Sequence, residues 1–167
     1  MALEDLYREI ILDHYRSPRN RGELPTPPAR SAEGFNPLCG DEVVVYVDLD
    51  DGGRLSDVKI GGQGCSISQS SASMMSAAVM GKSVEETRDL IRAFKAMMSI
   101  HERRLDADGH EVEEPVAADP GVELGDLEAL RGVVKFPVRI KCATLSWVTL
   151  AQVLDEAFAN EPEVPTA

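Results

Sequence analysis

Hydrophobic residues recur with the spacing of one helix face near both ends of the chain. Over residues 3–16 this pattern predicts a helix, which stops at Ser17-Pro18 because a residue before proline is pushed out of the helical region. In the last third of the chain, Pro137 stands where a first helical turn begins, and apolar residues continue at helical spacing to residue 158. Both segments are therefore predicted to be amphipathic helices.

Two further helices are predicted in the middle of the chain. Small residues and methionines fill residues 66–80, and Gly81 directly after them is suited to a helix C-terminus. Ser83 followed three residues later by Glu86 matches a capping box, in which the two side chains satisfy backbone N–H groups of the first turn. This pattern opens a helix that runs to about residue 98.

One pair of strands is predicted between the first two helices. Residues 43–49 and 55–60 are rich in β-branched side chains, and the turn-forming sequence Asp50-Asp51-Gly52-Gly53 separates them, which predicts a β-hairpin. The stretch 19–37 is rich in proline, glycine and arginine, and we interpret it as an extended connection.

A strongly acidic segment interrupts the chain before the last helix. Residues 106–128 hold nine Asp or Glu, and no Lys or Arg occurs between residues 105 and 130. We interpret about 105–132 as a solvated, mobile insertion that ends in a short helix near 127–132. The last seven residues, 161–167, hold two prolines and two glutamates and are predicted to be frayed. The expected organisation is one domain, residues 1–160, with that insertion.

Composition narrows the class of protein. The 167 residues are 43% hydrophobic, enough for a core, and carry a net charge of −12, which repels phosphate backbones and argues against nucleic-acid binding. No apolar run approaches the length of a membrane span, and the charged residues among the first fifteen leave no signal-peptide core, so no membrane association is expected. Three cysteines are too few for a disulfide scaffold, which indicates a reducing compartment and predicts a cytoplasmic protein.

The candidate chemistry lies in three cysteines and one aspartate. Cys65 stands at the head of a predicted helix, where the helix dipole favours a thiolate. Asp41 lies two residues from Cys39 across a glycine, so its carboxylate can turn toward that sulfur. Together with Cys142, early in the last helix, these groups suit a closed tetrahedral zinc site of three thiolates and one carboxylate. The combined negative charge of the four ligands would exceed the positive charge of the zinc ion.

Alternative interpretations of the same residues remain open at this point. The cysteines have no Cys-x-x-Cys spacing and can equally be three separate small hydrophobic residues. A cysteine hydrolase is disfavoured, because it needs a Cys–His pair and His14 is expected in or near the core. Arg139 lies about one helical turn before Cys142, and Lys141 directly precedes it. Both cations are placed to offset the negative charge of a metal site.

Four stretches in order resemble one family. They are Leu6-Tyr7-Arg8 with His14-Tyr15 and Pro18-Arg19-Asn20, then Asn36-Pro37-Leu38-Cys39-Gly40-Asp41, then Gly62-Gln63-Gly64-Cys65-Ser66-Ile67-Ser68, and finally Arg139-Ile140-Lys141-Cys142-Ala143-Thr144-Leu145. Over residues 3–158 the chain resembles the U-type iron–sulfur assembly proteins. The resemblance implies an α+β fold of the SufE/NifU-like kind, with a three-stranded antiparallel sheet packed with helices and the cysteines at one end.

Two features indicate the SufU branch of that family. Scaffold-type (IscU) members carry a histidine immediately before the third cysteine, where this chain has Lys141, and they lack a long segment corresponding to residues 105–132. The SufU branch implies a zinc site made by Cys39, Asp41, Cys65 and Cys142. It also implies a role as sulfur acceptor for a pyridoxal-phosphate-dependent cysteine desulfurase of the SufS type, with a downstream cluster-assembly scaffold as a further partner.

The resemblance also implies how the sulfur is accepted. A histidine of the desulfurase replaces Cys39 on zinc, which frees the Cys39 thiolate to receive the sulfur, and Arg139 supports the freed thiolate or the carboxylate. The chain would then be a sulfurtransferase-like partner rather than a stand-alone hydrolase or oxidoreductase. The alternative function is an IscU-type scaffold, on which the same cysteines hold an iron–sulfur cluster in place of zinc.

Overall fold

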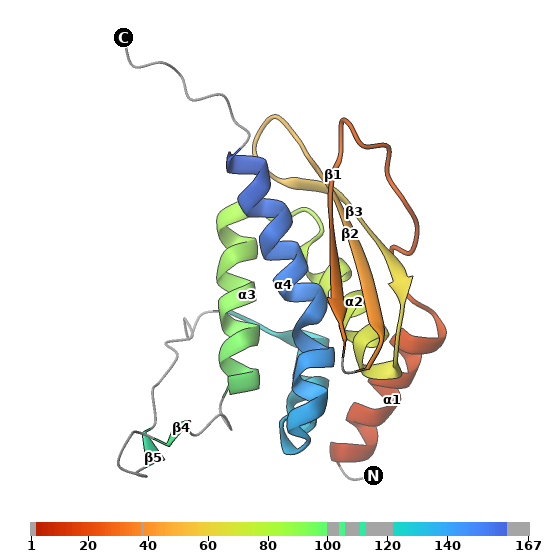
Figure 1. Ribbon diagram of the computed structural model, residues 1–167, viewed down its shortest axis with the longest axis vertical. Coiled ribbons are helices and arrows are strands. Elements are labelled where there is room, and N and C mark those ends of the chain that lie inside the picture. The colour runs from red at the N-terminus through yellow and green to blue at the C-terminus, as the bar shows by residue number, and fades with distance from the viewer. Residues whose placement is uncertain (1–2, 38, 100–103, 106–110, 113–121, 160–167) are drawn as a thin grey trace.

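The computed structural model describes residues 3–37, 39–99, 104–105, 111–112 and 122–159 (Figure 1). Strands and helices are grouped along the chain, with β1, β2 and β3 in succession and then α2 and α3, a pattern typical of an α+β protein. Their bounds are α1 Leu3–Arg16, β1 Arg30–Asn36, β2 Asp41–Leu49, β3 Leu55–Gln63, α2 Ser66–Val79, α3 Val84–Ser99, β4 Arg104–Leu105, β5 Glu111–Val112, the 3₁₀ helix η1 Gly125–Lys135 and α4 Pro137–Ala159.

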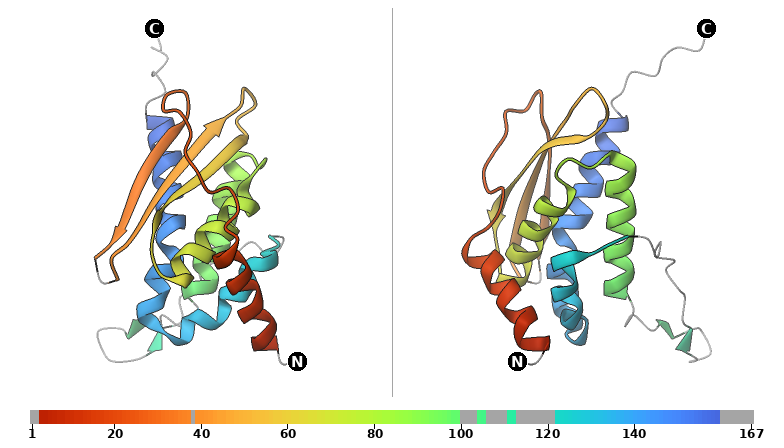
Figure 2. Two further views of the ribbon diagram at one scale, coloured as in Figure 1. Left: turned by 90° about the vertical axis from the view of Figure 1, so that its right-hand side faces the viewer. Right: turned by 180° about the vertical axis from the view of Figure 1, so that it is seen from behind.

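The main sheet has the strand order β1-β2-β3, and both pairs are antiparallel. Along β2, Val43, Val45 and Val47 are buried, because alternate side chains of a strand face the same side of the sheet. Helices α2 and α4 cover that face, and α3 lies on the side of α4 that is turned away from the sheet (Figures 1 and 2). This arrangement confirms the expected three-stranded antiparallel sheet packed with helices.

The helical layers are joined by buried aromatic and polar contacts. Phe94 of α3 stacks on Trp147 of α4 with ring centroids 4.4 Å apart. The indole N–H of Trp147 donates to Ser71 Oγ of α2 over 3.1 Å, so α4 is tied to both neighbouring helices. The predicted core position of His14 is confirmed, and its ring contacts Ser73 Oγ at 2.8 Å and Asp126 Oδ2 at 3.3 Å.

Two expectations from the sequence are wrong. The stretch 19–37 is not only an extended connection, because its last part forms strand β1. The inward positions of β1 include Ala32 and Asn36, which are small or polar and give no strand-like hydrophobic pattern. The solvated insertion does not extend to Gly132, since Leu127 and Leu130 of η1 are buried in the core.

Other expectations lie outside what the structure tests. Most of the acidic segment, residues 106–110 and 113–121, and the predicted frayed tail, 161–167, lie outside the described residues. None of the described helices is both long enough and apolar enough to cross a membrane.

Candidate metal centre

Three separate parts of the fold bring the cysteines to one end of the sheet. Cys39 lies in the turn between β1 and β2, where Gly40 adopts a φ of +71°, and Asp41 begins β2. Cys65 is the N-cap of α2, and Cys142 lies in the second turn of α4. Because Glu42 pairs with Gln63 in the sheet register, the β1–β2 turn and the start of α2 lie close together.

The ligand atoms of Cys39, Asp41 and Cys142 all lie within 4.8 Å of one another. The two sulfurs are 3.5 Å apart. The Cys65 thiol lies beside this group and donates to Asp41 Oδ2 over 3.8 Å. The cysteines differ in accessibility, since Cys39 is exposed, Cys65 is half-buried and Cys142 is buried.

Asp41 is the central polar group of the cluster. It is 1% exposed, and its Oδ1 accepts the backbone N–H of Cys65 over 2.9 Å. A Cβ on Gly64 would lie 2.7 Å from that same oxygen, so only glycine lets the Cys65 turn approach the carboxylate this closely. Gly64 therefore lets the backbone before Cys65 approach the carboxylate of Asp41.

Burial and neighbouring groups shift the pKa of the Cys142 thiol and of Arg139. Burial raises the pKa of the Cys142 thiol well above its usual range, with hydrogen bonds to Asp41 and Cys39 acting in the same direction. The exposed Arg139 guanidinium has its own pKa raised, first by a hydrogen bond to Cys142 and then by the charge of Cys65. A divalent cation would oppose the effect of burial, because metals bind the thiolate form.

Helix α2 adds a stabilising contact at Cys65. As the N-cap residue, Cys65 accepts the backbone N–H of Ser68 at its sulfur over 3.4 Å. This donor and the helix dipole both favour negative charge on the sulfur. The expectation that Cys65 stands at a helix start is confirmed.

Sequence reasoning missed Asn36 as a member of this centre. Asn36 is buried and its side-chain amide donates to Cys142 Sγ over 3.8 Å. Its backbone carbonyl accepts the N–H of Gly40 over 2.8 Å, which shapes the turn that carries Cys39. A signal was available, since Asn36 stands immediately before a proline in the segment that contains Cys39.

The chemistry of the donor set fits zinc. Thiolates with one carboxylate match its preference for sulfur and oxygen ligands in a four-coordinate site. The structure brings Cys39, Asp41 and Cys142 into one group and places Cys65 next to it. The complete four-ligand set, and the supporting role of Arg139, stay predictions.

Comparisons with known proteins identify a matching family and similar individual proteins. The family described as NifU-like N terminal domain matches residues 6–143. The zinc-dependent sulfurtransferase SufU of Bacillus subtilis is 44% identical over 95% of this chain and 93% of its own length. The iron–sulfur cluster assembly scaffold protein IscU of Streptococcus pyogenes is 36% identical over 91% of this chain and 84% of its own.

A solved structure has the same fold. The crystal structure of a putative iron–sulfur cluster assembly scaffold protein for the SUF system, from Fervidobacterium islandicum, superposes with a TM-score of 0.70 at 32% sequence identity. The match covers 92% of this chain and 99% of that chain.

Proposed function

Because this chain belongs to the NifU-like N terminal domain family, we propose that it is a zinc-dependent sulfur acceptor for iron–sulfur cluster assembly. Its sulfur donor is a pyridoxal-phosphate-dependent cysteine desulfurase of the SufS type, and it passes the sulfur on to a downstream assembly scaffold. The observation that carries this proposal is the exposed thiol of Cys39, which lies 3.5 Å from the buried sulfur of Cys142. The sequence similarity to the Bacillus sulfurtransferase supports it.

The difference in exposure supports different roles for the three cysteines. A partner protein can reach Cys39 in its turn, whereas Cys142 is buried in α4 and Cys65 is half-buried at the start of α2. Asp41, Cys65 and Cys142 would hold the metal together with Cys39 when the protein is not accepting sulfur. Bound zinc supplies positive charge that keeps the thiols deprotonated at neutral pH.

The transfer step needs no external oxidant. The Cys39 thiolate attacks the outer, sulfane sulfur of the desulfurase persulfide and forms a new S–S bond. The S–S bond of the donor breaks at the same time, and the donor cysteine leaves as a thiolate. The sulfane sulfur keeps its oxidation state, and Cys39 now carries the persulfide.

Mass spectrometry tests this assignment directly. The zinc-loaded protein is incubated with the desulfurase and cysteine, and its mass is read without reductant. We expect one added sulfur on Cys39 and none in Cys39→Ser, with zinc content and circular dichroism measured on both proteins as controls for folding. Added sulfur on Cys65 or Cys142, with normal uptake by Cys39→Ser, would refute the assignment.

A cluster scaffold is the second candidate, and the similarity to the Streptococcus scaffold protein favours it. The same thiols and carboxylate can bind iron as well as zinc. Anaerobic metal analysis separates the two functions. A colourless protein with about one zinc per chain supports the sulfur acceptor, whereas a brown protein with bound iron and sulfide supports the scaffold.

A further inference from the structure

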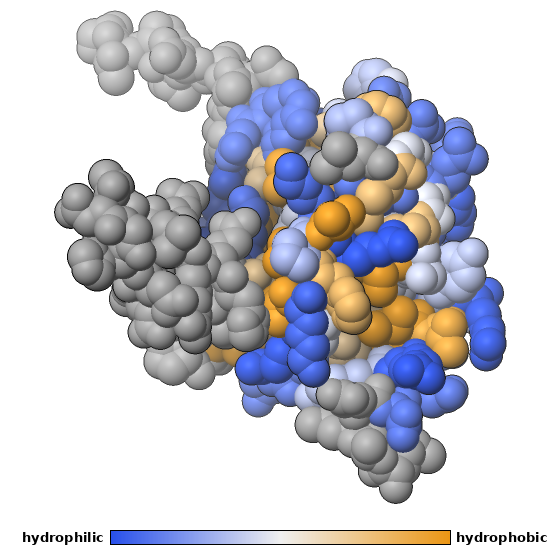
Figure 3. All heavy atoms as spheres, turned by 60° about the horizontal axis from the view of Figure 1, so that its bottom comes forward, coloured by the Kyte–Doolittle hydropathy of each residue, from blue (hydrophilic) through white to orange (hydrophobic). Residues whose placement is uncertain are grey.

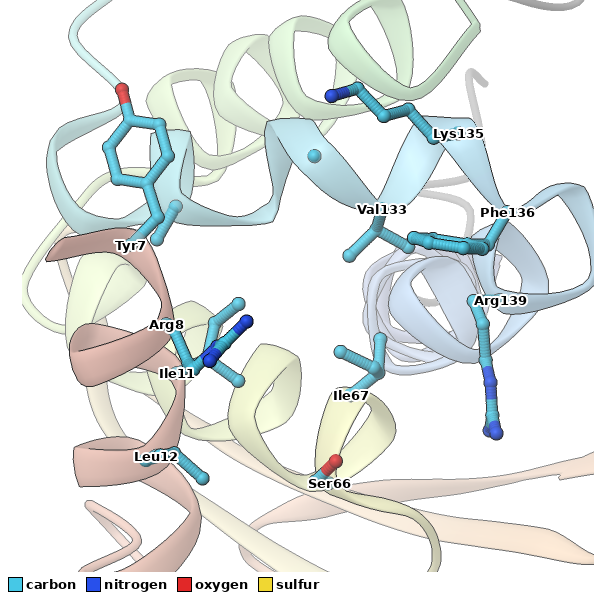
Figure 4. Close-up of a pocket in the computed structure, with 12 residues that line it drawn as sticks. Tyr7, Arg8, Ile11, Leu12, Ser66, Ile67, Val133, Lys135, Phe136 and Arg139 are labelled. Carbon is cyan, nitrogen blue, oxygen red and sulfur yellow. The ribbon is translucent and has the colours of Figure 1, made fainter. Parts of the chain in front are cut away.

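An open groove of about 720 Å³ lies between α1, the start of α2, η1 and the start of α4. Figure 4 shows α1 on the left of the opening, η1 along its top and α4 on its right, with Ile67 of α2 between α1 and α4. Most of the lining is apolar, and it includes Tyr7 and Ile11 of α1, Ile67 of α2, and Val133 and Phe136. Figure 3 shows apolar side chains gathered at the centre of the lower end of the molecule, between hydrophilic ones.

The charged residues that line this groove are all cations. They are Arg8 of α1, Lys135 of η1 and Arg139 of α4, and no Asp or Glu is among the lining residues. This concentration of positive charge stands out in a chain whose net charge is −12. The groove therefore complements a ligand that combines an apolar body with carboxylates.

The groove adjoins the metal centre. Ser66 lines the groove and directly follows Cys65, and Arg139, which also lines it, precedes Cys142 by three residues in α4. Phe136 in the groove is 62% exposed, and Val138 in the first turn of α4 is 60% exposed outside it, so apolar surface extends beyond the groove. Exposed apolar surface beside a reactive thiol is typical of a protein-binding site.

We propose that this groove binds an apolar segment of the persulfide donor that is flanked by Asp or Glu. This inference rests on the proposed function and names the surface through which that partner docks. The apolar lining supplies affinity, and the three cations fix the orientation of the segment. Docking there brings the partner to the end of the fold that carries Cys39.

Charge reversal tests the cationic part of the groove. Binding of the zinc-loaded protein to purified desulfurase is measured by calorimetry without cysteine, so the result does not depend on sulfur transfer. We expect Arg8→Glu to weaken binding by about tenfold and to reduce its salt dependence, whereas the matched control Arg30→Glu, at the far end of β1, changes it less than about twofold. Equal effects of the two variants would overturn the proposal.

Truncation tests the apolar part. We expect Phe136→Ser to weaken binding by about tenfold, and Val148→Ser, an equally apolar and 50% exposed position further along α4, to leave it within about twofold. Sulfur uptake by Cys39 from a low-molecular-weight persulfide should stay normal in Phe136→Ser. Normal desulfurase binding by Phe136→Ser would refute the docking surface, whereas failure of wild-type Cys39 to accept sulfur from either donor would refute the proposed function instead.

A cross-link identifies the occupant. Gly132 lines the groove, and a Cβ there would meet no atom within 4 Å, so a photoreactive side chain fits at this position. In the purified complex we expect a cross-link to an acid-flanked apolar segment of the desulfurase. Cross-linking only to a second copy of this chain, or to a basic segment, would overturn the proposal.

Discussion

Asp41 is both a predicted metal ligand and a hydrogen-bond acceptor for the backbone of the metal centre. It is buried and accepts the backbone N–H of Cys65, and a bound cation would compensate its negative charge further. Asp41→Asn keeps the size of the side chain and removes its charge. We expect zinc affinity to fall by about tenfold or more, the loss seen even when a group that only supports a ligand is changed.

Competition with a chromogenic chelator measures this affinity. Asp51→Asn, an exposed aspartate in the β2–β3 turn, is the matched control and should bind zinc as the wild type does. Unchanged zinc affinity in Asp41→Asn would remove the carboxylate from the ligand set.

Gly64 is a position where one added carbon should disturb the centre. The Cβ of Gly64→Ala would lie 2.7 Å from Asp41 Oδ1 and 3.1 Å from Ser68 Oγ, so the carboxylate must move. We expect weaker zinc binding with an unchanged circular dichroism spectrum. Gly132→Ala, where the Cβ meets open space, is the control. Wild-type zinc binding by Gly64→Ala would show that the turn can relax without cost to the site.

At the scale of single elements, the N-terminus of α3 shows how a predicted cap acts in the fold. Ser83 Oγ accepts the backbone N–H of Glu86 over 3.1 Å, and Glu86 Oε1 accepts the N–H of Ser83 over 3.4 Å. Hydrogen bonding of the Glu86 carboxylate with the Ser83 side chain, and then with the Ser83 backbone N–H, holds the pKa of Glu86 below its ordinary value of 4.5. The carboxylate therefore adds stability above pH 4.5, and this contribution is lost as the pH falls through the lower folded value.

Replacing the titrating group checks this sign. Glu86→Gln keeps the acceptor of the capping box and removes the charge change, so stability measured by urea unfolding should fall less steeply below pH 4.5 than in the wild type. Glu85→Gln, the exposed neighbour in the same turn, should leave the pH profile unchanged. Identical profiles for both variants would show that the cap does not couple folding to pH.

Helix η1 belongs to the core although it follows an acidic segment. Leu130 is fully buried, and its neighbour Arg131 is exposed. Leu130→Ala should lower the free energy of unfolding by about 2–5 kcal/mol, because it leaves a cavity. Arg131→Ala should change it by less than about 1 kcal/mol, since its ion pair with Glu128 is on the surface. Similar, small losses in urea unfolding would show that η1 packs loosely.

For the whole molecule, the metal centre joins parts of the chain that are far apart. Its residues come from the β1–β2 turn, the start of α2 and the start of α4. Structural zinc sites bind with roughly 10–16 kcal/mol, comparable with a domain stability of about 5–15 kcal/mol. Removal of zinc should therefore lower the melting temperature markedly, as followed by circular dichroism, and adding zinc back should restore it. Unchanged melting after complete removal would mean that the core alone holds these elements together.

Features that depend on neighbouring residues could be predicted from the sequence, whereas features that depend on contacts between distant segments could not. Helix α1 and the β2–β3 hairpin follow from periodicity and turn residues, which act over a few neighbouring positions. Strand β1 escaped prediction, because its inward side chains are small and its partner β2 supplies the hydrophobic contacts. Asn36 escaped for a different reason, since its contact with Cys142 joins residues more than a hundred positions apart.

The sequence by itself determined helix α1, the β2–β3 hairpin, the cap of α3 and the set of residue types suited to a metal. It could do so because backbone conformation and ligand chemistry depend on each residue and its near neighbours. Only the tertiary structure decided that Cys39 is exposed while Cys142 is buried beside it, and that η1 packs into the core. Accessibility and convergence depend on how distant segments pack against one another, and the spacing of residues along a chain does not contain that information.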